Sequence, residues 1–203
     1  MTGGWVRNGI SLDDAEPVEN ALVWWLQAPS KHCDLRLPLD GDDGLMSFAG
    51  TTTWAEPCLT WIPEIELDPS IFTDIGAISW DGADLMEAGV FVDGDRAVSY
   101  VERWQRLPGS DAELLALSCP TGRLVRTGPY ALTITDQRAH GGRFAAVAWT
   151  LAGGQWTVSH CWPPAATAPA PPLTVDDDAV VIVLSDGTQW TIDEHRKVAE
   201  ING

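Results

Sequence analysis

Short segments in which apolar and polar residues alternate recur along most of the chain. In the segment over 20–27, Ala21, Val23, Trp25 and Gln27 share one face, and a period of two is typical of a β-strand. Gly- and Asp-containing dipeptides separate these segments, as tight hairpin turns require. The predicted strands cover 20–27, 32–37, 46–54, 58–67, 73–80, 84–92, 96–107, 123–126, 130–137, 143–151, 155–161, 179–184 and 189–194.

Two segments depart from this pattern. Residues 111–117 (DAELLAL) begin with an acidic residue and bring three leucines together, which favours a helix of one or two turns. Residues 163–172 (PPAATAPAPP) contain too many prolines for a helix interior or a central strand. We therefore expect a semi-rigid connector there.

About a dozen short strands with almost no helix leave two architectures, a sandwich and a closed barrel. We favour an all-β, antiparallel up-and-down barrel, because hairpins between neighbours suffice to build it and closure removes the exposed edges. We place the barrel at 1–162, the connector at 163–172, and a C-terminal β-hairpin that packs on the barrel at 173–203.

The composition indicates a globular protein. Of 203 residues, 45% are hydrophobic and 20% are charged, and no apolar run reaches the length of a membrane span. The first ten residues lack the apolar core of a signal peptide. A net charge of −17 argues against a nucleic-acid partner, which needs a basic surface. We expect a cytoplasmic protein that binds neither nucleic acid nor membrane.

Most of the negative charge lies in the first half of the chain. Residues 1–95 contain eighteen acidic and three basic residues, a net charge of −15, against eleven and nine, or −2, in the remainder. Two interpretations stand. The acidic stretches at 13–19 and 40–43 are solvated loops, or they form a rim that favours cationic or neutral ligands over anions.

The four cysteines, Cys33, Cys58, Cys119 and Cys161, lie far apart and lack the spacing of a zinc site. We expect reduced thiols that pack as small apolar side chains, and no metal site.

Eleven tryptophans exceed what a small core accommodates, so we expect some of them to line a cavity. A barrel of about eight to ten strands encloses side chains or one small ligand. His160, which alternates with Trp156 and Val158, is either a core residue or, in a small barrel, a haem ligand, and we expect no cofactor. The ligand-binding residues that we assign are Trp25, Gln27, Trp61, Trp80, Trp104, Trp149, Trp156 and His160.

Two carboxylates meet in the hairpin predicted over 84–107. A turn at 93–95 brings Glu87 opposite position 101, give or take one residue, and therefore near Tyr100 and Glu102. When two carboxyl groups lie close together in a partly dry cavity, their pKa values move apart. One of them then holds a proton near neutral pH and acts as general acid or base. The alternative is structural, with Glu87 or Glu102 in a salt bridge to Arg36 or Arg103.

The segment over 32–37 has one charged and one apolar face. Asp34 and Arg36 share the charged face with His32. This face is exposed to solvent, or else the apolar face packs outward, beneath the N-terminal arm and the predicted helix. In the second case Asp34 and Arg36 form an internal ion pair, because buried charges need partners.

Several short motifs resemble a group of largely uncharacterised bacterial and fungal proteins with a calycin-like fold, a relative of the lipocalin barrel. The resemblance covers roughly residues 5–160 and implies this fold, and it brings no activity with it. Gly3 and Trp5 also meet the Gly-x-Trp spacing that opens lipocalin barrels. The motifs are Trp25-Leu26-Gln27, Asp34-Leu35-Arg36-Leu37-Pro38, Phe48-Ala49-Gly50, Cys58, Trp61, Asp74-Ile75-Gly76, Leu85-Met86-Glu87-Ala88-Gly89 and Tyr100-Val101-Glu102-Arg103-Trp104.

Three functions fit these observations. In the first, the barrel binds a small apolar or weakly polar molecule and transforms it without a cofactor, by cyclisation, isomerisation or dehydration. The second is a carrier with the same cavity and no chemistry, and the third is an interaction module with a filled cavity and an acidic face for a basic partner. The sequence leaves the oligomeric state open. The candidate catalytic residues are Glu87, Glu102, Tyr100, Asp34 and Arg36.

Overall fold

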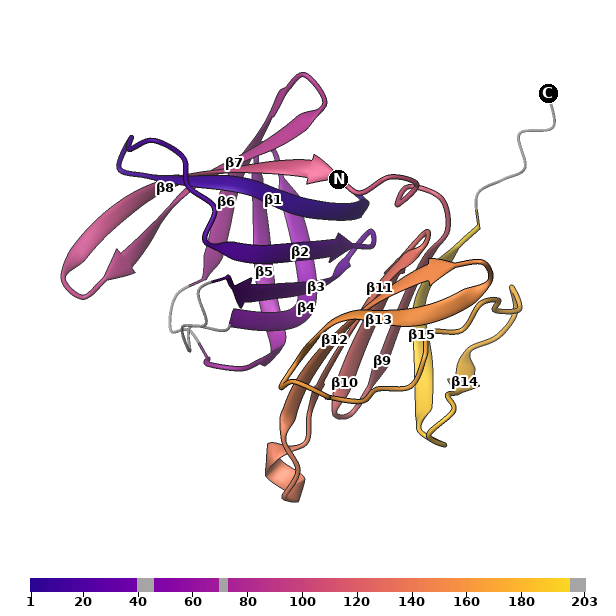
Figure 1. The fold of residues 1–203 in the computed structure, drawn as a ribbon. Coiled ribbons are helices and arrows are strands. Elements are labelled where there is room, and N and C mark those ends of the chain that lie inside the picture. The colour runs from indigo at the N-terminus through magenta and orange to yellow at the C-terminus, as the bar shows by residue number, and fades with distance from the viewer. Residues whose placement is uncertain (40–45, 70–72, 198–203) are drawn as a thin grey trace, which may run out of the picture.

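The computed structural model describes residues 1–39, 46–69 and 73–197, so the acidic stretch at 40–43 lies outside the described residues. The described chain is built almost entirely of β-strands, arranged as a barrel and a second sheet beside it (Figure 1). The elements are β1 (Gly3–Leu12), β2 (Ala21–Gln27), β3 (Lys31–Pro38), β4 (Met46–Ala55), β5 (Cys58–Glu66), β6 (Asp74–Asp81), β7 (Asp84–Asp93), β8 (Arg96–Arg106), β9 (Leu114–Cys119), β10 (Gly122–Thr127), β11 (Tyr130–Asp136), the 3₁₀ turn η1 (Arg138–His140), β12 (Phe144–Ala152), β13 (Gln155–Trp162), β14 (Val181–Val183) and β15 (Gln189–Arg196).

Strands β1 to β8 form a closed antiparallel barrel in which each strand pairs with the next along the chain. Closure comes from β1 and β8, which pair from Trp5 opposite Arg106 to Leu12 opposite Tyr100. The register shifts between Arg7 and Ile10, where Gly9 has a φ of 139° that other residues rarely adopt. The predicted all-β, antiparallel up-and-down barrel is confirmed.

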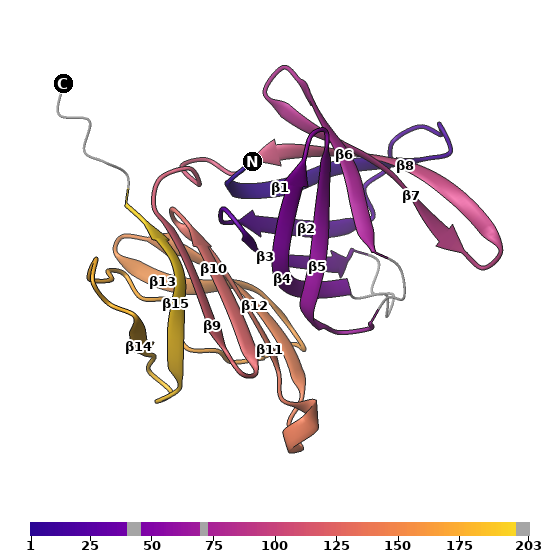
Figure 2. The same ribbon diagram turned by 180° about the vertical axis from the view of Figure 1, so that it is seen from behind.

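The barrel closes earlier than the sequence analysis placed its end. It is complete at Arg106, because β1 supplies an eighth strand that the sequence analysis did not assign. The strands over 114–162 belong instead to a second antiparallel sheet with the order β13-β12-β11-β10-β9-β15-β14 (Figure 2). The C-terminal strands β14 and β15 pair as a hairpin, and β15 joins this sheet at β9 rather than packing on the barrel.

The predicted helix over 111–117 is wrong. Leu114–Cys119 is strand β9, hydrogen-bonded to β10 on one side and to β15 on the other. Four consecutive residues from Leu114 to Leu117 are buried, so both faces of the strand are covered and the period of two is lost. A short apolar run of this kind fits a buried strand as well as a helix, and only its neighbours decide between them.

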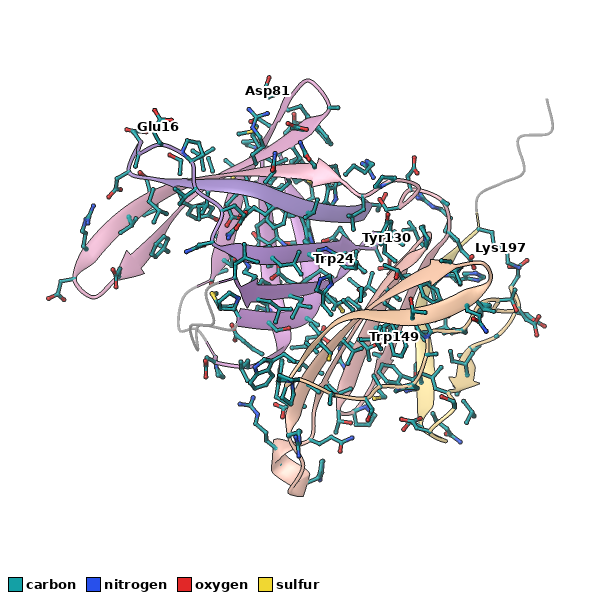
Figure 3. The ribbon with its side chains drawn as sticks, viewed as in Figure 1. Glu16, Trp24, Asp81, Tyr130, Trp149 and Lys197 are labelled. Atoms are coloured by element: carbon teal, nitrogen blue, oxygen red, sulfur yellow. The ribbon has the colours of Figure 1, made fainter. Side chains whose placement is uncertain are left out.

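The main core lies between the barrel and the second sheet. Trp24 and Leu26 of β2 and Leu35 of β3 point out of the barrel and pack against residues of β10, β11 and β12. Trp24 meets Tyr130 edge to face, with ring centroids 5.6 Å apart (Figure 3). The apolar face of 32–37 therefore does pack outward, beneath the second sheet and not beneath an N-terminal arm or a helix.

The proline-rich connector packs against the second sheet on its way to β14. Arg126 of β10 is buried, and its Nη1 donates hydrogen bonds to the carbonyl oxygens of Pro172 (2.8 Å) and Leu173 (2.9 Å). Beyond the connector, Val175 and Leu184 join Trp190 in a buried cluster. This segment thereby covers apolar side chains of the sheet.

The four cysteines are free; Cys33 and Cys119 are buried, and Cys58 and Cys161 are partly exposed. In the part of the chain that the structure describes, no helix has the length and apolar character needed to cross a membrane.

Candidate functional site

The barrel encloses a cavity of about 700 Å³ at the end where β1 finishes and β2 begins. All eight barrel strands contribute to its wall. Much of the wall near this end is apolar and includes Ile10, Leu12, Val90, Phe91 and Val92. The polar part includes Arg7, Arg36, Asp74, Glu87, Tyr100 and Glu102. A volume of this size is typical of small-molecule sites.

Glu87 and Glu102 face each other across the hairpin of β7 and β8. Both are almost fully buried, with 3% and 2% of their surface exposed. Tyr100 Oη donates a hydrogen bond to Glu87 Oε1 (2.9 Å), and Trp104 Nε1 donates to Glu87 Oε2 (3.1 Å). Glu87, Tyr100 and Glu102 therefore lie close together, as the sequence predicts.

Two glycines leave the room that this arrangement needs. A Cβ atom added at Gly89 would lie 2.5 Å from Tyr100 Oη, and one added at Gly76 would lie 2.6 Å from Glu87 Cγ. Real Cβ atoms do not approach other atoms so closely. The glycines of β6 and β7 thus define the positions of Glu87 and Tyr100 inside the barrel.

Glu102 is held by two arginines. Arg7 Nη1 lies 2.5 Å and Arg36 Nη1 3.5 Å from the same oxygen, Glu102 Oε1. Arg7 also binds Glu19, through Nε at 3.0 Å and Nη2 at 2.9 Å. Glu102 Oε2 is buried and has no hydrogen-bond partner among the described residues. This oxygen is an unused acceptor beside the cavity.

Asp34 and Arg36 form the internal ion pair that was one of two alternatives for this strand. Arg36 Nε lies 2.9 Å from Asp34 Oδ1, and Asp34 is 2% exposed. Burial disfavours the charge on Arg36, but Asp34 and Glu102 outweigh this effect and raise the pKa of Arg36 further above its ordinary value. The pair anchors a permanent positive charge in the barrel wall.

Three carboxyl groups of the site, those of Glu87, Asp34 and Asp74, have raised pKa values. Burial, followed by the charges of Glu102 and Asp74, raises the pKa of Glu87 well above its usual range. Burial raises the pKa of Asp34 to about 6 even though Arg36 opposes the shift. Burial and Glu102 also raise the pKa of Asp74. A group with a raised pKa beside an ion-paired carboxylate is the arrangement that general acid–base chemistry uses.

The tryptophan cluster fills the other end of the barrel instead of lining the cavity. Trp25 meets both Trp61 and Trp104 edge to face, each with centroids 5.5 Å apart, and Trp5 stacks on Trp25 at 6.3 Å. Gln27 accepts a hydrogen bond from Trp25 Nε1 (3.1 Å). These side chains form the floor beneath Glu87, whereas Trp80 is 54% exposed and lies over Trp5.

Three of the assigned ligand-binding residues lie outside the barrel, which corrects their placement in its wall. Trp149 packs in the second sheet, away from the barrel (Figure 3). Trp156 lies against the guanidinium of Arg126, and His160 contacts the outward-facing Trp24. They were assigned to the cavity because the barrel was expected to extend to residue 162.

Arg7, Glu19 and Asp74 belong to the site but are not among the residues predicted for it. Trp5 and Arg7 both point into the barrel, as alternate residues of β1 should. The register shift at Gly9 interrupts this alternation after two inward residues, so the pattern is too short to predict a strand. Glu19 belongs to the acidic stretch at 13–19 and contacts Arg7 because the chain folds back between β1 and β2.

His32 also points into the barrel, beneath the cavity. It is fully buried beside Phe48, and neither ring nitrogen has a hydrogen-bond partner within the described ranges. Burial lowers its pKa to about 3, so the ring is neutral at neutral pH. Among the residues described, no group of three or more His, Cys, Asp or Glu side chains is arranged to hold a metal ion.

Comparison with known proteins adds a fold relationship. No family model and no curated protein sequence matches the chain. The structure is similar to the crystal structure of uncharacterized protein YLR301w from Saccharomyces cerevisiae, with a TM-score of 0.75 over 96% of this chain and 98% of that one. The two sequences are 13% identical. A likeness at this identity shows a shared fold, and membership of a calycin-like family stays a prediction.

Proposed function

We propose that this protein binds a small, largely apolar molecule inside its barrel. The observation that carries the proposal is a cavity of about 700 Å³ whose wall is apolar toward one end and which holds a few buried polar groups at its base. Such a combination buries most of a ligand and orients it through a small number of polar contacts. The buried tryptophan cluster lies beneath the cavity.

Binding is tested with N-phenyl-1-naphthylamine, a neutral apolar dye that fluoresces when it leaves water. We expect the protein to enhance its emission and Ala21→Trp, which places an indole in the cavity wall, to abolish the enhancement. Ala88→Trp is the matched control, because Ala88 lies on β7 and is exposed outside the cavity. Equal enhancement by wild type and both folded variants, checked by circular dichroism, would refute the proposal.

Acid–base catalysis on the bound molecule is a second candidate, favoured by the pairing of Glu87 with Glu102. Glu87 has a raised pKa and is a proton donor, and Glu102, held by Arg7 and Arg36, is its ion-paired counterpart. Tyr100 and the Asp34–Arg36 pair position these groups. The chemistry that needs only such residues is cyclisation, isomerisation or dehydration without a cofactor.

Native mass spectrometry of the purified protein identifies a molecule that co-purifies with it. If the protein is an enzyme, Glu87→Gln and Glu102→Gln each slow turnover of that molecule by at least about a hundredfold, the usual contribution of a general acid or base. Variants that retain full turnover exclude the acid–base role, and variants that only weaken binding favour a carrier.

A further inference from the structure

The polar end of the cavity carries more negative than positive groups. Two guanidinium groups, those of Arg7 and Arg36, face five carboxyl groups around them. The carboxyl groups are those of Glu19, Asp34, Asp74, Glu87 and Glu102; because the raised pKa of Glu87 favours its neutral form, the other four carry the negative charge. Two negative charges balance the two arginines, and the remaining negative charge has no cationic partner among these groups. The interior of the barrel therefore attracts positive charge.

The charges of the two arginines are already compensated by carboxylates. Arg7 uses Nε and Nη2 on Glu19 and Nη1 on Glu102. Arg36 uses Nε on Asp34 and directs Nη1 toward Glu102. A ligand carboxylate or phosphate would add a further negative charge beside these buried carboxylates, and like charges repel strongly where water is excluded.

One acceptor of the site is, by contrast, unused. Glu102 lines the cavity, is 2% exposed, and its Oε2 has no hydrogen-bond donor within the described part of the chain. Buried carboxylate oxygens without a donor are rare, because desolvation is then not repaid. A ligand group that donates a hydrogen bond and carries positive charge would complete this site.

The walls near Glu102 suit a cation with an apolar tail. Phe91 and Tyr100 lie side by side in the wall, with ring centroids 6.2 Å apart, and aromatic faces attract ammonium groups. Ile10, Leu12 and Val92 continue the wall with apolar surface. The cavity thus offers a carboxylate, aromatic rings and apolar side chains in one place.

We propose that the cavity selects an amphiphilic amine, whose ammonium group binds the free oxygen of Glu102 while its hydrocarbon part lies along the apolar wall. This inference rests on the proposed function, since it names the class of ligand for the same cavity. It corresponds to the sequence-level interpretation in which the acidic half of the chain favours cationic or neutral ligands over anions.

Three ligands of equal chain length test the proposal on the wild-type protein: decylamine, decanol and decanoate, each titrated at neutral pH against bound N-phenyl-1-naphthylamine. Decylamine is protonated under these conditions. We expect its dissociation constant to be at least about tenfold lower than that of decanol, with decanoate the weakest. The series requires no variant to fold.

Glu102→Gln then locates the charge effect. It removes the negative charge but keeps an isosteric hydrogen-bonding group, so the preference for decylamine over decanol should fall to about twofold or less. Asp95→Asn is the matched control, because it removes one charge from an exposed position at the tip of the same hairpin. This variant should keep the full preference.

The outcomes separate the two proposals. Equal binding of decanol and decylamine, or tighter binding of decanoate, overturns the amine proposal and leaves a ligand-binding barrel. An undiminished preference in Glu102→Gln, or an equal loss in Asp95→Asn, also overturns it. If neither the dye nor any of the three ligands binds, both the proposed function and this inference fail.

Discussion

At the scale of single residues, the barrel keeps Glu87 in an environment that favours its neutral form. The side chain is buried, faces Glu102 and is hydrogen-bonded to Tyr100 and Trp104. Its pKa is therefore raised above the value of an unfolded chain, chiefly by burial. The folded protein binds this proton more tightly than the unfolded chain does, so the stabilisation is present at low pH and is lost as the pH rises toward the folded pKa.

Glu87→Gln should remove this pH dependence. As the pH rises above the ordinary pKa of a glutamate, about 4.3, the wild type is expected to lose up to about 1.4 kcal/mol of unfolding free energy per pH unit through Glu87, and the variant to show a flatter profile. Glutamine mimics the neutral acid and keeps both hydrogen-bond partners. Urea denaturation at a series of pH values measures the difference, with the exposed Glu16→Gln as control. Parallel profiles for wild type and Glu87→Gln would contradict the shift.

The residues of the site differ in how far the sequence predicted them. Glu87, Tyr100 and Glu102 belong to one hairpin, so a local turn fixes which of them meet. Asp74 reaches the same cluster from β6, the strand that precedes β7, whereas Arg7 comes from β1, far from Glu102 in sequence. The contact of Arg7 with Glu102 depends on closure of the barrel, which no local pattern specifies.

At the scale of elements, the small residues of β7 are as important as its glutamate. Gly89 lies opposite Tyr100 in the ladder, and the ring occupies the space in which a Cβ atom of residue 89 would stand. A strand interior normally disfavours glycine. Here the close approach of an aromatic side chain explains its presence.

Gly89→Ala should destabilise the protein by about 1 to 3 kcal/mol, because the methyl group overpacks the wall and displaces Tyr100 from Glu87. The urea midpoint measures this loss. In a Tyr100→Val background the clash is absent, and the same substitution should become neutral or stabilise by up to about 1 kcal/mol through reduced freedom of the unfolded chain. Equal losses in both backgrounds would show that Tyr100 is not the cause.

At the scale of the whole molecule, the barrel and the second sheet share a core. The outward faces of β2 and β3 are as fully buried as the inward ones, since Leu26 and Leu35 pack against β10 to β12. The cavity-forming strands are thus fixed from outside by the second sheet. We expect the two layers to unfold together.

Leu35→Ala tests this coupling. It should cost about 2 to 5 kcal/mol, the usual range for a buried leucine, and raise amide exchange in β10 as much as in β3. Hydrogen exchange with mass spectrometry gives the comparison. Val101→Ala, at a barrel position that is 39% exposed, should change stability by less than about 0.5 kcal/mol. Increased exchange confined to the barrel would mean that the layers unfold independently.

The sequence by itself determined where most strands lie and which neighbours form hairpins, because alternation and turn residues act over a few positions. It also determined that Glu87 would face Tyr100 and Glu102. Tertiary structure decided the remainder: that β1 closes the barrel at eight strands, that Leu114–Cys119 is a strand, and that Trp149, Trp156 and His160 lie outside the cavity. These features depend on pairing between distant segments and on burial of both faces of a strand. Burial of both faces removes the alternation of apolar and polar residues that identifies a strand and its inward side in the sequence.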